Sequence, residues 1–229
     1  VLFVAVMCYV ILMLFKYLSK KKEEKPETGG IKNIIFDVGQ VLVDYDWETY
    51  LDSFGFEPVK RERIAKATFQ SPVWDERDRG LYEEDVYLKQ FQELDPEDAE
   101  DIEKVIRGTG GTIHKRPYAD TWVKYLKSKG YHLYILSNYA SYMIDHTKKE
   151  LTFRKEMDGE VFSCYVNQLK PEPEIYQTIL DKYQLKPEES VFIDDRPENC
   201  QGAQEQGIHT ICFKDFKQVT ADLEKLGVK

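Results

Sequence analysis

The sequence has no pair of cysteines or histidines at metal-binding spacing. Its four cysteines, Cys8, Cys164, Cys200 and Cys212, are far apart, and its four histidines are scattered. A disulfide scaffold needs paired cysteines, and a structural zinc site needs closely spaced ligands, so neither organises this chain. We expect free, reduced thiols in a cytosolic compartment.

A sustained basic stripe is also missing beyond residue 30. The chain has 32 Lys and Arg against 41 Asp and Glu, which gives a net charge of −9. Nucleic acids are bound by clustered Lys and Arg, so we expect no nucleic-acid partner for the folded part. Internal repeats are absent, and no low-complexity tract occurs outside the linker at residues 19–31.

A long apolar run is present at the start of the chain. Val1–Phe15 contains no charged residue, and a cluster of lysines follows it. Fifteen helical residues span only about 22 Å, less than a hydrocarbon core of about 30 Å. Because no small-x-small cleavage pattern precedes Ser19, we interpret residues 1–18 as a membrane anchor with a cytoplasmic domain behind it. A cleaved leader, or a start-site artefact that leaves a soluble cytoplasmic protein, is the alternative.

The rest of the chain divides by its hydrophobic periodicity. Residues 19–31 have linker composition, 32–46 open with a buried strand, and 47–115 show helical periodicity. From 116 to 229 helices and strands alternate, which is typical of a parallel sheet covered on both faces. We predict an α/β protein with a Rossmann-like core (32–46 and 116–229), an inserted helical cap (47–115) and a short apolar N-terminal segment.

The predicted elements follow from periodicity and from Gly and Pro positions. The predicted strands are 33–36, 132–136, 161–163, 190–193 and 208–213. The predicted core helices are 118–129, 140–150, 173–183, 197–206 and 217–226. Within 47–115, the expected helix starts are Pro58, Pro72 and Pro96.

Polar side chains follow three of the predicted strands. Asp37 follows the first strand, Ser137 and Asn138 follow the second, and Asp194 and Asp195 end the strand at 190–193. The carboxyl ends of parallel strands meet at one edge of a sheet, so we expect these groups to converge there.

The converging groups have complementary chemistry, with Lys170 supplied by a loop or helix start nearby. Clustered carboxylates repel one another unless a divalent cation lies among them, and Mg²⁺ prefers such oxygen ligands. A lysine and a hydroxyl can hold phosphate oxygens against that metal. One carboxylate could then attack phosphorus and form an aspartyl-phosphate.

Four short motifs carry a resemblance to a known family. They are Phe36-Asp37-Val38-Gly39, Leu136-Ser137-Asn138, Lys170-Pro171 and Phe192-Ile193-Asp194-Asp195. With these motifs in this order, residues 32–216 resemble the haloacid dehalogenase superfamily. Within it the chain is most similar to small phosphatases of sugar phosphates such as α-glucose-1-phosphate, and to the N-terminal phosphatase domain of epoxide hydrolases. The stretches Arg79-Gly80, Arg116-Pro117 and Lys170-Pro171-Glu172 contribute to that closer match.

The resemblance implies a role for each motif. Asp37 is the nucleophile, Ser137 is a phosphate ligand, and Lys170 steadies both the nucleophile and the transferring phosphoryl group. Asn138 orients the substrate or the loop. The implied ligands of Mg²⁺ are Asp37, the carbonyl of Gly39, Asp194 and Asp195, with Asn199 in support. Residues 47–115 become a cap that closes over the substrate.

Gly39 departs from the family's pattern. Most phosphatases of the family carry a second Asp two residues after the nucleophile, which protonates the leaving alcohol and then activates water. A general acid or base contributes about 10² to 10⁴ in rate, so we expect a slower enzyme that still turns over. Asp44 or Asp46 could substitute through a water molecule, but helix capping or solvation is the simpler interpretation of both.

Two arginines in the helical segment are candidate ligands for an anionic substrate. Arg77 and Arg79 lie in a stretch that could face the site entrance, and we predict substrate binding by Arg79. The alternative is ion pairing with Asp75 and Asp78.

The sequence therefore predicts a Mg²⁺-dependent phosphatase that acts on a small phosphorylated metabolite, such as a sugar phosphate, through an aspartyl-phosphate. A metal-independent 2-haloacid dehalogenase would use Asp37 on carbon, but it has no use for the negative charge of Asp194 and Asp195. A non-catalytic binding module is the other alternative, because Gly39 replaces the usual acid.

Overall fold

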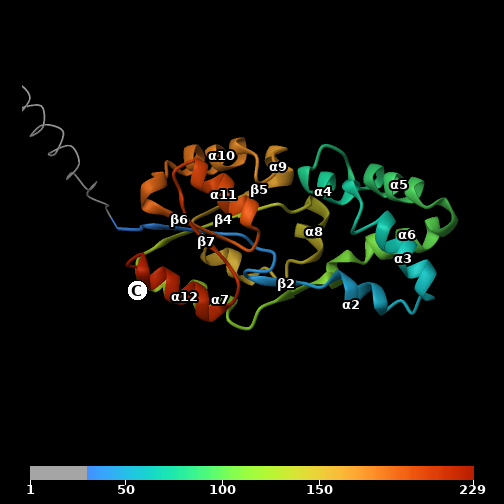
Figure 1. Ribbon diagram of the computed structural model, residues 1–229, viewed down its shortest axis with the longest axis horizontal. Coiled ribbons are helices and arrows are strands. Elements are labelled where there is room, and N and C mark those ends of the chain that lie inside the picture. The colour runs from blue at the N-terminus through green and yellow to red at the C-terminus, as the bar shows by residue number, and fades with distance from the viewer. Residues whose placement is uncertain (1–29) are drawn as a thin grey trace, which may run out of the picture. The chain divides into compact units, whose positions relative to one another are not determined.

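A parallel sheet lies at the centre of the described part of the chain, which is residues 30–229 of a computed structural model (Figure 1). The strands, in their order across the sheet, are β5 (Gly159–Phe162), β4 (His132–Ser137), β1 (Asn33–Phe36), β6 (Ser190–Asp194) and β7 (His209–Cys212). All neighbouring pairs are parallel. The predicted α/β class with a parallel core is confirmed.

All residues of β1 are buried because this strand lies in the middle of the sheet. A strand with neighbours on both sides and helices on both faces has almost no exposed surface, so its sequence is mostly apolar. Ile35 pairs in register with Tyr134 of β4 and with Phe192 of β6. This register places Asp37 level with Asp194 and one residue before the level of Ser137.

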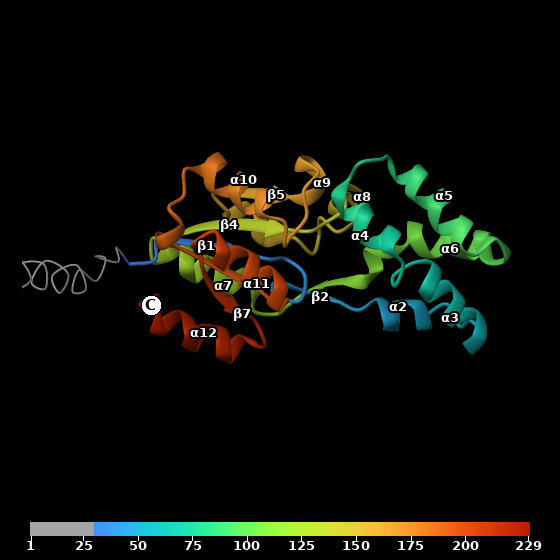
Figure 2. The same ribbon diagram turned by 45° about the horizontal axis from the view of Figure 1, so that its top comes forward.

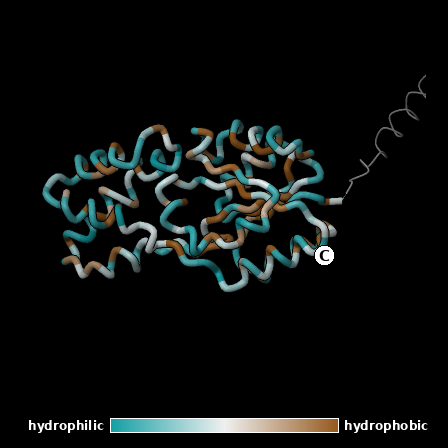
Figure 3. Tube along the Cα trace, turned by 180° about the vertical axis from the view of Figure 1, so that it is seen from behind, coloured by the Kyte–Doolittle hydropathy of each residue, from teal (hydrophilic) through white to brown (hydrophobic). Residues whose placement is uncertain are grey.

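Helices cover both faces of the sheet (Figure 1). One face is covered by α7 (Ala119–Ser128) and α12 (Phe216–Lys225), the other by α10 (Pro173–Tyr183) and α11 (Pro197–Glu205). Phe36 contacts Trp122 on the first face, and Phe192 contacts Tyr176 on the second. Figure 3 shows hydrophobic residues gathered along the strands between these layers. Two short helices, α8 (Ser141–His146) and α9 (Ser163–Val166), follow β4 and β5.

Residues 47–112, called the helical insertion below, lie beyond one end of the sheet in both Figure 1 and Figure 2. Its helices are α2 (Trp47–Asp52), α3 (Pro58–Ala67), α4 (Pro72–Arg79), α5 (Glu84–Leu94) and α6 (Ala99–Arg107). The insertion has a hydrophobic core of its own, to which Phe91 and Ile102 contribute. Two prolines begin α3 and α4 as predicted, and Pro96 begins a 3₁₀ turn (Pro96–Asp98) before α6.

Two short antiparallel strands carry the chain from the core into the insertion and back. They are β2 (Val43–Tyr45) and β3 (Ile113–Lys115), and they pair with each other. The prediction of helical structure throughout 47–115 is therefore wrong for its last three residues. A segment of three residues is too short to show a period, and its pairing partner is far away in the sequence.

A second correction concerns the predicted helix at 140–150, which is shorter than expected. α8 ends at His146, and a 3₁₀ turn (Thr152–Glu156) follows. The hydroxyl of Thr147 donates a hydrogen bond of 2.6 Å to the carbonyl of Met143, and such side-chain bonds compete with helix continuation. The other predicted core elements agree with their predicted bounds to within two residues, whereas β2 and α9 are not predicted from the sequence.

The predicted anchor, residues 1–18, and nearly all of the linker at 19–31 lie outside the described residues. Between residues 30 and 229, no helix has both the length and the apolar character needed to cross a membrane. The cysteines of this part, Cys164, Cys200 and Cys212, are free thiols, as expected.

Truncation of Phe91 tests whether the insertion has a packed core. Phe91 is fully buried, so Phe91→Ala leaves a cavity and should lower the free energy of unfolding by about 3–5 kcal/mol. Leu94 lies on the same helix but is 52% exposed, so Leu94→Ala should change stability by less than about 1 kcal/mol. Urea unfolding measures both variants. Similar losses for the two would contradict a packed core around Phe91.

Candidate active site

The ends of β1, β4 and β6 bring the predicted site residues to one edge of the sheet. Asp37 directly follows β1, and its backbone N–H donates a hydrogen bond of 2.9 Å to the carbonyl of Ile193. Asp194 and Ser137 are the last residues of β6 and β4. Lys170 approaches from the loop before α10.

Lys170 is buried between two carboxylates. Its Nζ lies 2.9 Å from Oδ1 of Asp37 and 2.6 Å from Oδ2 of Asp194. Burial alone would lower the pKa of Lys170, but Asp194 and Asp37 together raise that pKa above its ordinary value. The lysine is therefore charged, and it fixes the position of both carboxylates.

Asp37 has an unusual pKa as well. Burial raises the pKa of this carboxyl to about 6, against the opposing effect of Lys170, and Asp194 adds to the rise. Burial together with Asp194 also raises the pKa of Asp195. The negative charge at this edge is thus only partly balanced by protein groups.

The three carboxylates fit a small divalent cation. Asp37, Asp194 and Asp195 each offer an oxygen atom, and these atoms all lie within 4.8 Å of one another. Asn199 steadies Asp194 through hydrogen bonds of 3.0 and 3.1 Å from its amide to the carboxylate. Carboxylate oxygens are the ligands that Mg²⁺ prefers, and a cation would supply the charge that Lys170 alone does not.

Asn138 holds the loop that carries Lys170. Its amide nitrogen donates to the Lys170 carbonyl at 3.0 Å, and the Lys170 N–H donates to its amide oxygen at 2.8 Å. Of the two roles implied for Asn138, this geometry shows loop orientation. The neighbouring hydroxyl of Ser137 is buried beside Asp37 and makes no hydrogen bond of regular geometry among the described residues, so it can turn to an incoming ligand.

A cavity of about 300 Å³ opens over this edge of the sheet. From the core it is lined by Asp37, Gly39, Gln40, Asn138, Lys170, Asp195, Arg196 and Asn199, among others. From the insertion and the β2–β3 pair it is lined by Tyr45, Trp47, Phe69, Trp74, Asp75, Asp78 and Ile113. The cavity therefore joins the carboxylate edge to a largely aromatic wall.

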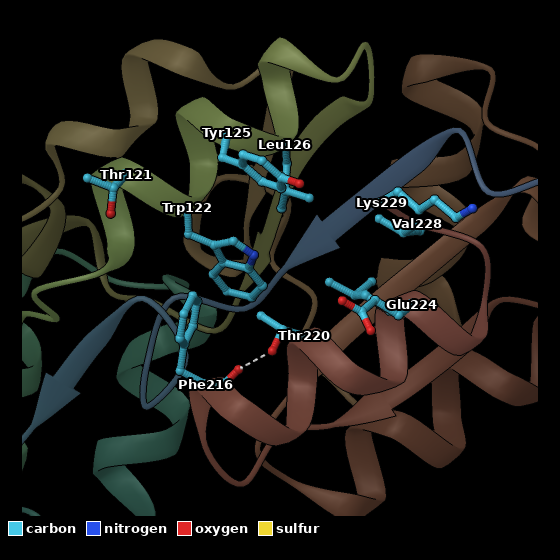
Figure 4. A pocket seen from close by; sticks show the side chains of 10 residues that line it. Thr121, Trp122, Tyr125, Leu126, Phe216, Thr220, Glu224, Val228 and Lys229 are labelled. Atoms are coloured by element: carbon cyan, nitrogen blue, oxygen red, sulfur yellow. Dashed lines mark hydrogen bonds between the residues drawn. The ribbon is translucent and has the colours of Figure 1, made fainter.

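A larger cavity of about 660 Å³ lies elsewhere, between α7 and α12 (Figure 4). Trp122 and Phe216 face each other within it, and Glu224 and Lys229 are its charged lining residues. It contains none of the residues of the carboxylate edge. Chemistry, and not size, identifies the candidate active site.

Arg79 lies outside the cavity lining. Its guanidinium donates two hydrogen bonds to the carboxylate of Glu172, at 2.9 and 2.7 Å, and another to Glu76 at 3.1 Å. Glu172 follows Lys170 by two residues. The structure thus uses Arg79 to join α4 to the loop of Lys170 and does not bring it to the predicted substrate position.

Arg77 is buried and pairs with Glu84 through two hydrogen bonds of 3.0 and 2.6 Å. The alternative interpretation, in which the two arginines pair with Asp75 and Asp78, is wrong in its partners. Those two aspartates line the cavity instead. Sequence reasoning missed them, and Tyr45 of β2, as site residues because no motif marks the side chains that the insertion and the β2–β3 pair supply.

The family model for haloacid dehalogenase-like hydrolases matches residues 31–207, a range that spans the carboxylate edge and most of the core. The chain belongs to this family. The resemblance predicted from the four motifs is confirmed. In this haloacid dehalogenase-like hydrolase, the buried Asp37–Lys170 pair lies at the carboxyl ends of the strands of the parallel sheet.

Among curated relatives, this hydrolase is 34% identical over 107 residues to Bifunctional epoxide hydrolase 2 of Rattus norvegicus, which covers 44% of the chain and 19% of that protein. The chain thus matches about a fifth of the length of that relative. It is also 25% identical over 211 residues to Flavin mononucleotide hydrolase 1 of Arabidopsis thaliana, which covers 92% of the chain and 83% of the relative.

A solved structure supports the same fold. A haloacid dehalogenase family enzyme of Bacteroides thetaiotaomicron, in complex with magnesium and inorganic phosphate, superposes with a TM-score of 0.66. It covers 83% of this chain and 99% of that one, at 23% sequence identity. At this identity the similarity establishes the shared fold.

Removal of Lys170 tests how far the site depends on its buried charge. In Lys170→Met the carboxylates of Asp37 and Asp194 lose their positive partner, so the folded-state pKa of Asp37 rises further. The folded protein then binds more protons than the unfolded chain between about pH 4 and 8, and stability falls as pH rises. Urea unfolding in chelator should show a loss of about 3–5 kcal/mol at pH 8 and a smaller loss at pH 5.

Lys32 provides the matched control, because its pair with Glu189 is on the surface and its side chain is 57% exposed. Lys32→Met should change stability by less than about 1 kcal/mol at either pH. A loss in Lys170→Met that is equal at pH 5 and pH 8 would contradict the charge explanation.

Proposed function

We propose that this protein is a Mg²⁺-dependent phosphatase that hydrolyses a small phosphorylated metabolite through an aspartyl-phosphate on Asp37. The observation that carries the proposal is the buried contact of Asp37 with Lys170 next to Asp194 and Asp195. In one cavity it brings together a nucleophile in a fixed position, carboxylates that can bind a cation, and the positive charge of Lys170.

Each residue of the edge has a step to perform. Lys170 orients the attacking oxygen of Asp37 and balances charge on the phosphoryl group. The Ser137 hydroxyl donates to a phosphate oxygen, and Asn138 keeps the Lys170 loop in place. Magnesium, when bound, supplies further positive charge among the carboxylates of the cluster.

The helical insertion acts as a cap over the substrate. It contributes Trp47, Phe69 and Trp74 to the lining of the cavity, across from Asp37. Aromatic side chains bind the apolar or flat part of a small molecule, whereas the carboxylate edge takes the phosphate. The Arabidopsis relative is named for flavin mononucleotide, a phosphate ester with a flat ring, and that ester belongs in the substrate panel beside sugar phosphates.

The dehalogenase alternative fits this site less well. Substitution at carbon by Asp37 gains nothing from two further carboxylates within 4.8 Å, and their charge opposes an anionic haloacid. Chloride release from a haloacid in the presence of chelator would overturn the preference for phosphatase.

Phosphate release tests the function directly. Wild type should hydrolyse p-nitrophenyl phosphate or a member of a panel of sugar phosphates and flavin mononucleotide when Mg²⁺ is present. Asp37→Asn removes the nucleophile, so kcat should fall by about 10³-fold or more. Asp145→Asn replaces an exposed aspartate of α8 and should leave kcat unchanged. If wild type releases no more phosphate than Asp37→Asn, the phosphatase proposal fails.

Metal binding can be tested without turnover. A cation that binds only the folded protein stabilises it by about 2.7 kcal/mol at 100 times its dissociation constant. Titration with Mg²⁺ should therefore raise the thermal midpoint of wild type, and Asp195→Asn should lose most of that rise. A midpoint that does not respond to Mg²⁺, or that responds equally in the two proteins, argues against this cation site.

A further inference from the structure

The proposed phosphatase lacks an acid at the position two residues after its nucleophile, where Gly39 stands. The two nearby candidates are engaged elsewhere. Asp44 pairs with Arg116 at 2.9 Å, and Asp46 caps α2 by accepting the N–H of Thr49 at 3.0 Å. Neither lines the cavity. The proton for the leaving alcohol must come from another group.

Four carboxyl groups line the cavity: Asp37, Asp75, Asp78 and Asp195. Asp37 and Asp195 belong to the carboxylate cluster, and Asp75 is exposed to water. Asp78 is half-buried at the end of α4 and faces the same space as the nucleophile. We propose that Asp78 is the general acid and base of this enzyme, supplied by the insertion in place of the missing residue; this rests on the proposed phosphatase function.

The backbone at Asp78 is held against the core. The hydroxyl of Ser163 donates a hydrogen bond of 2.5 Å to the Asp78 carbonyl. The amide of Asn167 donates to the carbonyls of the next two residues, at 3.1 and 3.0 Å. Both donors precede Lys170 in the same segment between β5 and α10, so one stretch of chain positions Asp78 and the active-site lysine.

Two further features secure this end of α4. Gly80 adopts a left-handed conformation with φ of 71°, and a Cβ there would lie 2.7 Å from the carbonyl oxygen of Cys164. Glycine therefore allows a close approach of α4 to α9 that a side chain would block. The pair of Arg79 with Glu172 spans the same junction. Arg79 thus helps to position Asp78, the residue that precedes it on α4.

The electrostatic surroundings suit proton transfer. Burial raises the pKa of Asp78 to about 7, Arg77 and the Ala140 amide oppose the rise, and Asp75 and Asp37 add to it. The other titratable groups that face Asp78 have pKa values raised by burial and are neutral at pH 7: Tyr45, Tyr139 and Cys164. A carboxyl group that titrates near the working pH can both donate and accept a proton.

The two steps balance in atoms and charge. Asp37 attacks phosphorus, the bond from phosphorus to the ester oxygen breaks, and protonated Asp78 gives its proton to that oxygen, which leaves as the alcohol. Water then attacks the phosphorus of the aspartyl-phosphate, and Asp78 takes a proton from this water. The bond to Asp37 breaks, phosphate leaves, and both aspartates return to their starting states.

A comparison of leaving groups tests this assignment. p-Nitrophenolate leaves without a proton, whereas the alkoxide of an alkyl or sugar phosphate needs one. Asp78→Asn should lower kcat/KM by about 10² to 10⁴ for the best alkyl ester of the panel and by less than about 10-fold for p-nitrophenyl phosphate. Equal losses for the two substrates would overturn the proposal. So would a wild type that hydrolyses p-nitrophenyl phosphate and none of the alkyl esters.

A neighbouring variant and a rescue separate chemistry from folding. Asp75→Asn, one turn earlier on α4, should affect both substrates alike, and a selective loss there would assign the acid to Asp75 instead. A Cβ at Gly39 meets no atom within 4 Å, so a side chain can start there without a clash at its first carbon. In the Asp78→Asn background, Gly39→Asp should raise kcat/KM for the alkyl ester by at least about 10-fold. Absence of recovery would overturn the assignment.

The outcomes distinguish the two proposals. If wild type and Asp37→Asn release equal phosphate from p-nitrophenyl phosphate, the phosphatase function itself fails. If Asp37→Asn loses phosphatase activity but Asp78→Asn changes kcat/KM equally for the two substrates, the phosphatase function is supported and the proposed role of Asp78 is wrong.

Discussion

The site depends on one buried charge. Lys170 lies between Asp37 and Asp194 at 2.9 and 2.6 Å, and its removal would leave two buried carboxyl groups without a positive partner. Much of the surrounding architecture serves that contact. The parallel register aligns the ends of β1 and β6, and the side chain of Asn138 forms two hydrogen bonds with the backbone of Lys170. Lys170 offsets only part of the negative charge, and that shortfall is what makes the edge receptive to a cation.

The rest of the cavity belongs to the helical insertion. The sheet edge supplies the clustered carboxylates, the buried lysine and the Ser137 hydroxyl, and these are the groups that short motifs identify. The insertion supplies an aromatic wall and the carboxyl groups of Asp75 and Asp78. Membership in the haloacid dehalogenase-like hydrolases accounts for the first set. The second set bears on the departure at Gly39, because the proposed acid and base, Asp78, belongs to it.

Local patterns in the sequence were enough to predict the core. The buried run before Asp37, the prolines that begin helices and the polar residues after strands all depend on neighbours in the chain, so they survive without a structure. The pairing of β3 with β2 and the ion pair of Arg79 with Glu172 could not be predicted in this way, because each joins segments far apart in sequence. The stretch that contains Asp78 is expected from the sequence to face the site entrance, but Asp78 itself is predicted only as an ion-pair partner, because its position opposite Asp37 also joins segments far apart in sequence.

The β2–β3 pair has a mechanical consequence. The chain enters and leaves the insertion through two strands bonded to each other, so the two crossings cannot move independently. The insertion also contacts the core at two other places. The C-terminal end of α4 packs on α9 and Glu172, and the hydroxyl of Tyr142 in α8 donates a hydrogen bond of 2.6 Å to the carbonyl of Arg107. Separation of α4 from α9 would move Trp74 and Asp78 away from Asp37 together, so the aromatic wall and the proposed proton donor depend on the same junction.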